Sequence, residues 1–267
     1  MTTGALIFAF NNEEIDYVSM AAWSAKNIRK HLGIPVAVVT DSAEHELLNR
    51  VFDQVILCQS KSGGSRYFED YKKNVTWNNV ARIDAYNLTP WDCTLVLDAD
   101  YVVDSSALTT ILKSTSDFMC HKNAYDMTAT KTFNELNCFG KHKLPMWWAT
   151  VMLFTKSNVA EYIFDCMHMI KNNWQHYRNL YGIQNSTYRN DYALSIAIGI
   201  VSGHSMYVDE IPWGLSSVSP DHELTFDGGQ YRVKYNDAQN NLKYISFKGL
   251  DFHAMGKYHL GQIIEST

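Results

Sequence analysis

The order of apolar and polar positions in the first sixty residues predicts three strands that alternate with two helices. Short apolar runs bounded by polar residues are typical of strands, and they occur at residues 4–10, 35–40 and 55–58. The segment 16–31 instead keeps its apolar residues at helical spacing, and Gly33 suits the end of that helix. A shorter helix is predicted over residues 43–51. Because strands and helices alternate, we expect a parallel, right-handed wound sheet.

The rest of the chain predicts further elements, with one interruption. Strands are expected at residues 95–97, 118–121 and 206–211, helices at residues 76–86, 107–112, 157–181 and 188–200, an apolar segment at 146–155, and a turn at 237–241. The interruption is the segment 59–73, which contains two adjacent glycines and is basic at Arg66, Lys72 and Lys73. This segment is either a solvated loop or a lid over an anionic ligand.

Two carboxylates directly follow a strand that we expect to be buried. Leu95, Val96 and Leu97 run into Asp98 and Asp100. Burying carboxylates is costly unless a cation pairs with them, and open α/β sheets bind ligands outside the carboxyl ends of their strands. We therefore expect Asp98 and Asp100 to hold a hard divalent cation, Mg²⁺ or Mn²⁺, partly through substrate phosphates. The alternative is a strand end followed by a solvated acidic turn.

The length of 267 residues favours one large α/β domain, with or without an elaboration. A net charge of −5 argues against a general nucleic-acid-binding surface. No apolar run is long enough to span a bilayer, and the first residues lack the pattern of a secretory signal. The five cysteines are widely spaced and form no Cys-x-x-Cys motif, so we expect reduced cysteines and a cytoplasmic location.

Three segments carry motifs that point to one enzyme family. The first holds Ala9, Phe10 and Asn11 after the opening strand, with Tyr17 just beyond. The second, residues 87–100, ends in Leu-Asp-Ala-Asp, and the third, residues 253–257, is His-Ala-Met-Gly-Lys. The second is similar to a Leu-Asp-x-Asp metal motif and the third to a late His-x-x-Gly-x-x-Lys segment. Together they resemble the GT-A fold glycosyltransferases, nearest to the glycogenin and bacterial lipopolysaccharide galactosyltransferase type.

The resemblance implies a fold and a division of the chain. It implies a GT-A fold of the α/β class, with a Rossmann-like, mostly parallel central sheet flanked by helices and a small antiparallel C-terminal elaboration. The whole chain, residues 1–267, would be one domain. Residues 1–104 would form its nucleotide-binding half, and residues 105–267 would supply the acceptor-binding half and the C-terminal metal and phosphate segment.

The resemblance also implies roles for individual residues. The implied metal ligands are Asp98, Asp100 and His253, and the implied nucleotide-binding residues are Ala9, Phe10, Asn11, Tyr17, Arg82, Asp98 and Lys257. Asp191 stands where the family has an acidic residue near the reacting sugar, and a helix N-cap is the alternative. Trp147, Trp148 and Thr150 replace the family's Asn-Ser/Thr-Gly facing the acceptor. These tryptophans either stack on a sugar or a base, or belong to the core.

The activity implied by the resemblance is metal-dependent hexosyl transfer, with retention of configuration, from a nucleoside diphosphate sugar such as a UDP-sugar. The cofactor would be Mn²⁺ or Mg²⁺, because a divalent cation stabilises the charge on the departing diphosphate. The acceptor is left open among a glycan, a protein, a small molecule and modified DNA.

Other protein classes share parts of this pattern. In a haloacid-dehalogenase-type phosphohydrolase Asp98 would be the nucleophile, but that motif normally opens its domain, and here three predicted strands precede it. A sugar-phosphate nucleotidyltransferase should have a glycine-rich first loop, whereas residues 10–14 are Phe-Asn-Asn-Glu-Glu. A calcium-binding EF-hand loop that starts at Asp98 would need glycine in place of Val103 and glutamate in place of Thr109.

Overall fold

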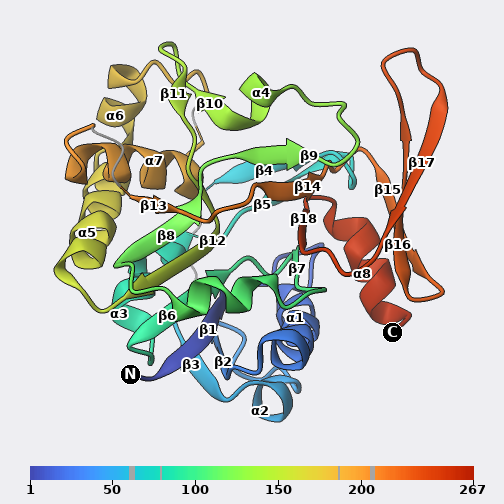
Figure 1. Cartoon of the computed structure of the whole chain (residues 1–267), viewed down its shortest axis with the longest axis horizontal. Coiled ribbons are helices and arrows are strands. Elements are labelled where there is room, and N and C mark those ends of the chain that lie inside the picture. Colours follow the sequence, from blue (N-terminus) through green and yellow to red (C-terminus); the bar gives the residue numbers. More distant parts are fainter. Residues whose placement is uncertain (60–63, 79, 186, 205–207) are drawn as a thin grey trace.

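A seven-stranded sheet forms the centre of the computed structural model, which describes residues 1–59, 64–78, 80–185, 187–204 and 208–267 (Figure 1). Its strand order is β13-β8-β12-β6-β1-β2-β3. The strands are β1 (Thr3–Phe8), β2 (Val36–Thr40), β3 (Gln54–Leu57), β6 (Cys93–Leu97), β8 (Phe118–His121), β12 (Trp148–Thr155) and β13 (Asp209–Glu210). Neighbouring strands are parallel, except that β12 is antiparallel to both β6 and β8. The predicted mostly parallel α/β sheet is therefore confirmed.

Helices flank this sheet and the smaller sheets described below. They are α1 (Tyr17–Leu32), α2 (Leu48–Val51), α3 (Ala85–Leu88), α4 (Phe133–Asn137), α5 (Asn158–Asn172), α6 (Trp174–Leu180), α7 (Asn190–Val201) and α8 (Lys257–Glu265). Helix α1 contacts β1 and β2, α7 contacts β12, and α5 packs on α7. The strands β2 and β6 are buried along their whole length, which explains why they are continuous apolar runs rather than alternating ones.

The first helix begins and ends where the sequence predicts, because local groups satisfy its ends. At its start the Asp16 side chain accepts a hydrogen bond from the Ser19 N–H at 3.0 Å. At its end Gly33 has a φ of +69° and donates its N–H to the Arg29 carbonyl oxygen at 3.1 Å. A positive φ is strained for residues with a side chain, so glycine suits this position.

A second, smaller sheet brings the late part of the chain back to the strand end of β6. It contains β7 (Tyr101–Val102), β18 (Phe252–Ala254), β14 (Leu215–Val218) and β9 (Ala124–Asp126), in that order. Strand β18 is antiparallel to β7, and His253 lies opposite Tyr101. Because Tyr101 directly follows Asp100, this register places His253 beside the acidic motif.

Three further sheets are small and antiparallel. They are β4 (Ser65–Phe68) with β5 (Lys73–Thr76), β10 (Cys138–Phe139) with β11 (Leu144–Pro145), and β15 (Glu223–Asp227), β16 (Gln230–Asn236) and β17 (Leu242–Phe247). The three-stranded sheet lies beside α8 at one side of the molecule (Figure 1). It is the C-terminal antiparallel elaboration that the sequence predicted.

The helix predicted over residues 76–86 is wrong. Thr76 belongs to β5, and the following residues form a 3₁₀ turn, η1 (Val80–Asp84), before the single turn of α3. Tertiary contacts hold this segment: the Glu13 carboxylate accepts hydrogen bonds from the Thr76 N–H at 3.2 Å and hydroxyl at 3.4 Å, and the Arg82 side chain is buried. Such contacts override a weak local helix preference.

Other predicted boundaries also need correction. The helix expected over residues 157–181 is divided into α5 and α6 at Asn173, whose side-chain amide donates to the Met169 carbonyl oxygen at 2.9 Å. Only α2 is helical within residues 43–51, and the segment 107–112 forms two 3₁₀ turns, η2 (Ala107–Thr109) and η3 (Ile111–Lys113). The predicted strand 206–211 lies partly outside the described residues, and its described part contains β13. Within the described ranges, every helix is too short or too polar to traverse a lipid bilayer.

His121, at the end of β8, is a histidine outside the acidic motif. His121 is fully buried, and its Nδ1–H donates to the Trp213 carbonyl oxygen at 2.9 Å. Among the described residues its Nε2 has no partner. Burial lowers the pKa of His121 to about 4, and the bond to the Trp213 carbonyl opposes that shift only in part.

We predict that His121 makes the protein less stable in mild acid. The unfolded chain binds a proton at His121 below pH about 6.5, whereas the folded protein binds it only near pH 4, so stability falls across this window by about 3 kcal/mol. His121→Gln should flatten this part of the profile in urea denaturation at several pH values. The exposed His142→Gln is the matched control, and equal pH slopes in all three proteins would contradict the prediction.

Candidate active site

A cavity of about 280 Å³ opens at the carboxyl ends of β1 and β6. Its walls come from segments that are far apart in the sequence: the end of β1, the β4–β5 hairpin, the end of β6, strand β12, the start of α7, strand β18 and the start of α8. The lining residues include Phe10, Tyr17, Glu69, Asp70, Arg82, Asp98, Asp100, Trp148, Arg189, Asp191, His253 and Lys257. Most of the residues that the sequence selected therefore meet in one cavity.

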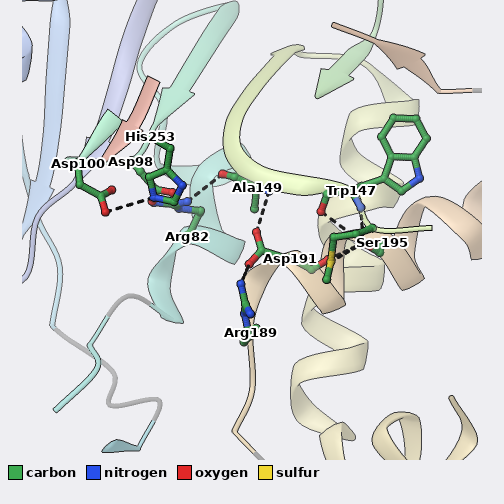
Figure 2. A network of polar contacts seen from close by, with 10 residues as sticks. Arg82, Asp98, Asp100, Trp147, Ala149, Arg189, Asp191, Ser195 and His253 are labelled. Carbon is green, nitrogen blue, oxygen red and sulfur yellow. Dashed lines mark hydrogen bonds and ion pairs between the residues drawn. The ribbon is translucent and has the colours of Figure 1, made fainter. Parts of the chain in front are cut away.

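Asp98, Asp100 and His253 form a cluster at the base of this cavity. Each residue offers a ligand atom, and these atoms lie within 4.8 Å of one another. The His253 Nε2 is 3.3 Å from the Asp100 Oδ2 (Figure 2). Two neighbouring ligands of an octahedral ion with bonds of about 2.1 Å lie about 3 Å apart. The Asp100–His253 pair has about this spacing, and all three side chains have the donor chemistry that a small divalent cation takes.

Lys257, the first residue of α8, also contacts Asp100. Its Nζ is 2.5 Å from the Asp100 Oδ2 and donates to the Met255 carbonyl oxygen at 2.9 Å. Burial raises the pKa of Asp100, but the charge of Lys257 and the charge and hydrogen bond of His253 outweigh it and hold that pKa well below its usual value. Asp100 is therefore an ionised carboxylate, although only 4% of it is exposed.

Arg82, another lining residue, forms an ion pair with Asp98. One terminal nitrogen of Arg82 pairs with the Asp98 carboxylate, and the other donates to the Ala149 carbonyl oxygen at 2.8 Å (Figure 2). The Arg82 side chain is almost completely buried. The sequence suggested that Arg82 contacts the phosphate or sugar of a donor. In the structure both of its terminal nitrogens are bonded within the protein.

Asp191 also contacts the backbone of Ala149. Its Oδ1 accepts the Ala149 N–H at 3.0 Å, and its Oδ2 accepts a hydrogen bond from Arg189 at 2.7 Å. Burial raises the pKa of Asp191, but the Arg189 charge and the Ala149 N–H together lower it below the usual value. The helix N-cap position is held by Arg189, so Asp191 is a residue of the first turn of α7 rather than its cap.

Ser195, one turn along α7, fixes the position of the Asp191 backbone. The Ser195 hydroxyl donates to the Asp191 carbonyl oxygen at 2.7 Å and accepts the Trp147 N–H at 2.7 Å. Figure 2 shows this group next to the Ala149 peptide, which joins it to Arg82 and Asp98. A continuous set of hydrogen bonds therefore connects the metal-ligand cluster to α7. Sequence reasoning missed Ser195, because a serine within a helix carries no recognisable signal.

The predicted nucleotide-binding residues near β1 have different environments. Phe10 and Tyr17 line the cavity. Ala9 is fully buried and donates its N–H to the Val39 carbonyl oxygen at 2.9 Å. The Asn11 side chain accepts the Val18 N–H at 3.0 Å and donates to Asp16 at 2.9 Å. Ala9 and Asn11 are not among the described lining residues, and Asn11 supports the start of α1.

The segment expected to form a basic loop is instead largely a hairpin with acidic residues toward the cavity. Strands β4 and β5 are joined by a turn in which Glu69 and Asp70 line the cavity. The two lysines of the turn pair with protein carboxylates, Lys72 with Glu69 at 3.5 Å and Lys73 with Glu14 at 2.6 Å. Residues 60–63, which include Gly63, lie outside the described residues.

The two tryptophans that replace the family motif face different spaces. Trp148 lines the main cavity together with Thr150. Trp147 lines a separate, mostly apolar cavity of about 140 Å³, with Ser195 in its wall. Both indoles are buried. Trp148 is therefore placed to contact a ligand in the main cavity, whereas Trp147 belongs to the packing behind it.

Comparisons with known proteins give structural similarities only. No protein-family model matches the sequence, and no curated protein sequence matches it significantly. The glycosyltransferase GlyE of Streptococcus pneumoniae TIGR4 is 12% identical with a TM-score of 0.46, and the match covers 79% of this chain and 46% of GlyE. The galactosyltransferase LgtC, in complex with donor and acceptor sugar analogues, is 13% identical with a TM-score of 0.46, covering 78% of this chain and 72% of LgtC.

A nucleotidyltransferase is also among the similar structures. The inositol-1-phosphate CTP transferase of T. maritima is 11% identical with a TM-score of 0.44, and the match covers 79% of this chain and 84% of that one. Glycosyltransferases are thus among the structures that this chain resembles, and the matched part spans about half the length of GlyE. Sequence identities this low do not show the activity, so the evidence for the activity comes from the residues of the cavity.

The buried position of Arg82 yields a stability prediction. Arg82→Met should lower the free energy of unfolding by about 3–5 kcal/mol, because it leaves the Asp98 carboxylate and the Ala149 carbonyl without their partner. Urea denaturation measures this loss. Arg29→Met is the matched control: its pair with Asp53 spans 2.6 Å, but the side chains are 34% and 42% exposed, so the cost should stay below about 1 kcal/mol. Equal losses would contradict the structural role of Arg82.

Proposed function

We propose that this protein is a metal-dependent glycosyltransferase that moves a sugar from a UDP-sugar to an acceptor. The observation that carries the proposal is the convergence of Asp98, Asp100 and His253 with Lys257 at the base of one cavity. A divalent cation and a lysine side by side are suited to a departing diphosphate, because both neutralise the charge that develops on it.

The charge balance of the cavity supports a requirement for the cation. The three carboxylates of Asp98, Asp100 and Asp191 are matched by three cations, which are Arg82, Arg189 and Lys257. With His253 neutral, as a metal ligand must be, these groups sum to zero, and the Glu69 and Asp70 carboxylates that also line the cavity leave no excess of positive charge. A nucleoside diphosphate brings at least two negative charges into the cavity, so it needs an added positive charge to bind tightly.

The chain's own residues have separate tasks in this scheme. Asp98, Asp100 and His253 would hold Mn²⁺ or Mg²⁺, which when bound supplies positive charge to the diphosphate. Phe10 and Tyr17 offer aromatic faces to the nucleotide base. Lys257 would bind a phosphate oxygen of the leaving group.

Asp191 is assigned to the reacting sugar. The anomeric carbon gains positive charge as the bond to the diphosphate breaks, and a fixed carboxylate stabilises that charge. Asp191 suits this role because the Ala149 N–H and Arg189 hold both of its oxygens and keep it ionised. We infer retention of configuration and a hexose donor from the resemblance in the sequence motifs.

The acceptor is expected to enter past Trp148 and Arg189. Both line the cavity near Asp191, and an indole ring can stack on a sugar or a base. A glycan, a protein, a small molecule and modified DNA all offer a hydroxyl group for such a site. A phosphohydrolase fits less well, because its nucleophile would be Asp98, whose carboxylate is paired with the buried Arg82.

We predict that UDP binds at least about tenfold more tightly with Mn²⁺ than with EDTA, a typical strength of coupling between two ligands. The reason is that the metal-free cavity has no excess of positive charge, because each of its lining cations Arg82, Arg189 and Lys257 is already paired with a carboxylate. Isothermal titration calorimetry of UDP under the two conditions measures the ratio. Asp100→Asn should remove most of the difference, whereas the surface variant Asp237→Asn should keep it. Equal UDP affinity with Mn²⁺ and EDTA in the native protein would rule out the metal-bridged site.

A second assay separates the two enzyme classes. A UDP-sugar should be consumed in the presence of Mn²⁺, and His253→Ala should abolish most of this turnover while the melting temperature stays within a few degrees of the native value. A generic aryl phosphate should not be hydrolysed. Aryl phosphate hydrolysis that disappears in Asp98→Asn would instead favour the phosphohydrolase, in which Asp98 forms an aspartyl phosphate.

A further inference from the structure

Lys257 contacts the carboxylate oxygen that a metal ion would need. The Asp100 Oδ2 lies 2.5 Å from the Lys257 Nζ and 3.3 Å from the His253 Nε2. A cation shared by Asp100 and His253 would bond to the Asp100 Oδ2 and the His253 Nε2 at about 2.1 Å. Its double charge would then lie within about 5 Å of the ammonium group, in a part of the cavity where Asp100 is only 4% exposed.

Water cannot screen such a pair of like charges well, because the surroundings are buried. The pairing that now stabilises Asp100 would become a repulsion between Lys257 and the ion. The lysine and the metal therefore compete for Asp100, and one has to leave when the other arrives.

The Lys257 side chain can leave without disturbing the fold. Lys257 lines the cavity, and its second bond, to the Met255 carbonyl oxygen, is local. The backbone around it is anchored independently, since the Asp70 carboxylate accepts the N–H of Tyr258, the next residue of α8, at 2.9 Å. A rotation of the flexible lysine stem into the cavity is enough to free Asp100.

We infer that Lys257 takes the place of the metal ion in the free protein, as an internal stand-in for it. Its ammonium group holds Asp100 until a diphosphate draws that group away. This inference rests on the proposed function and adds a consequence to it. Mn²⁺ alone has to displace Lys257 and binds weakly, whereas a nucleoside diphosphate offers the lysine a new partner and so releases Asp100. Metal and nucleotide binding are then cooperative through one side chain, and by reciprocity each strengthens the other.

The test measures Mn²⁺ binding without any nucleotide. Lys257→Met and Lys257→Gln keep most of the length of the side chain and remove its charge, so both should bind Mn²⁺ at least about tenfold more tightly than the native protein, within the range usual for coupled sites. Isothermal titration calorimetry with MnCl₂ gives the affinities, and bound Mn²⁺ is confirmed by electron paramagnetic resonance. Lys26→Met, an exposed position on α1, is the matched control and should bind like the native protein.

A second titration in the presence of saturating UDP measures the coupling. The ratio of Mn²⁺ affinities with and without UDP should be smaller in Lys257→Met than in the native protein, because the lysine no longer opposes the ion. Thermal melts establish that each variant is folded, and if Lys257→Met does not fold, Lys257→Gln decides the question.

The outcomes separate this inference from the proposed function. If the native protein binds Mn²⁺ with UDP but the two variants bind Mn²⁺ alone no more tightly than it does, Lys257 is not a stand-in for the metal, and the proposed function survives. If the native protein and the variants bind no Mn²⁺ with or without UDP, both proposals are wrong. Tighter binding in both variants and native-like binding in Lys26→Met supports the inference.

Discussion

Three carboxylates in the wall of one cavity, Asp100 buried and Asp98 and Asp191 partly buried, set the electrostatic constraint on this structure. An ionised carboxylate in such surroundings is stable only when a cation lies beside it. Each of the three has its own partner: Asp98 pairs with Arg82, Asp100 with Lys257, and Asp191 with its neighbour Arg189. The 3₁₀ turn η1 and the start of α8 must therefore meet the end of β6, and the Ala149 N–H attaches Asp191, at the start of α7, to β12.

Backbone pairing provides the rigid frame for these charges. Strand β18 lies against β7, which places His253 next to the acidic motif. The Ala149 carbonyl oxygen in β12 accepts from Arg82 and the Ala149 N–H donates to Asp191, so the backbone of one residue connects the two side chains. Sites built on strands and helix starts hold their geometry more closely than sites on loops. The groups that have to move can then be limited to single side chains.

The β4–β5 hairpin shows how sequence charge can mislead. Its lysines suggested a basic cover for an anionic ligand, yet Lys73 pairs with Glu14, and the side chains that line the cavity are Glu69 and Asp70. Asp70 also receives the Tyr258 N–H, so the hairpin is attached to α8. The composition of a segment states which charges it carries. The pairing of strands decides which of them face the ligand.

The sequence by itself determined the alternation of strands and helices, the start and end of α1, and the Asp98-Ala-Asp100 motif at a buried strand end, because these depend on local periodicity, caps and the cost of burying charge. Only the tertiary structure decided that the helix expected over residues 76–86 does not form, that Arg82 pairs with Asp98 and Ala149, and that Lys257 contacts Asp100. These features depend on residues up to about 160 positions apart, which no local pattern records. They arise because buried polar groups must find partners wherever the folded chain supplies them.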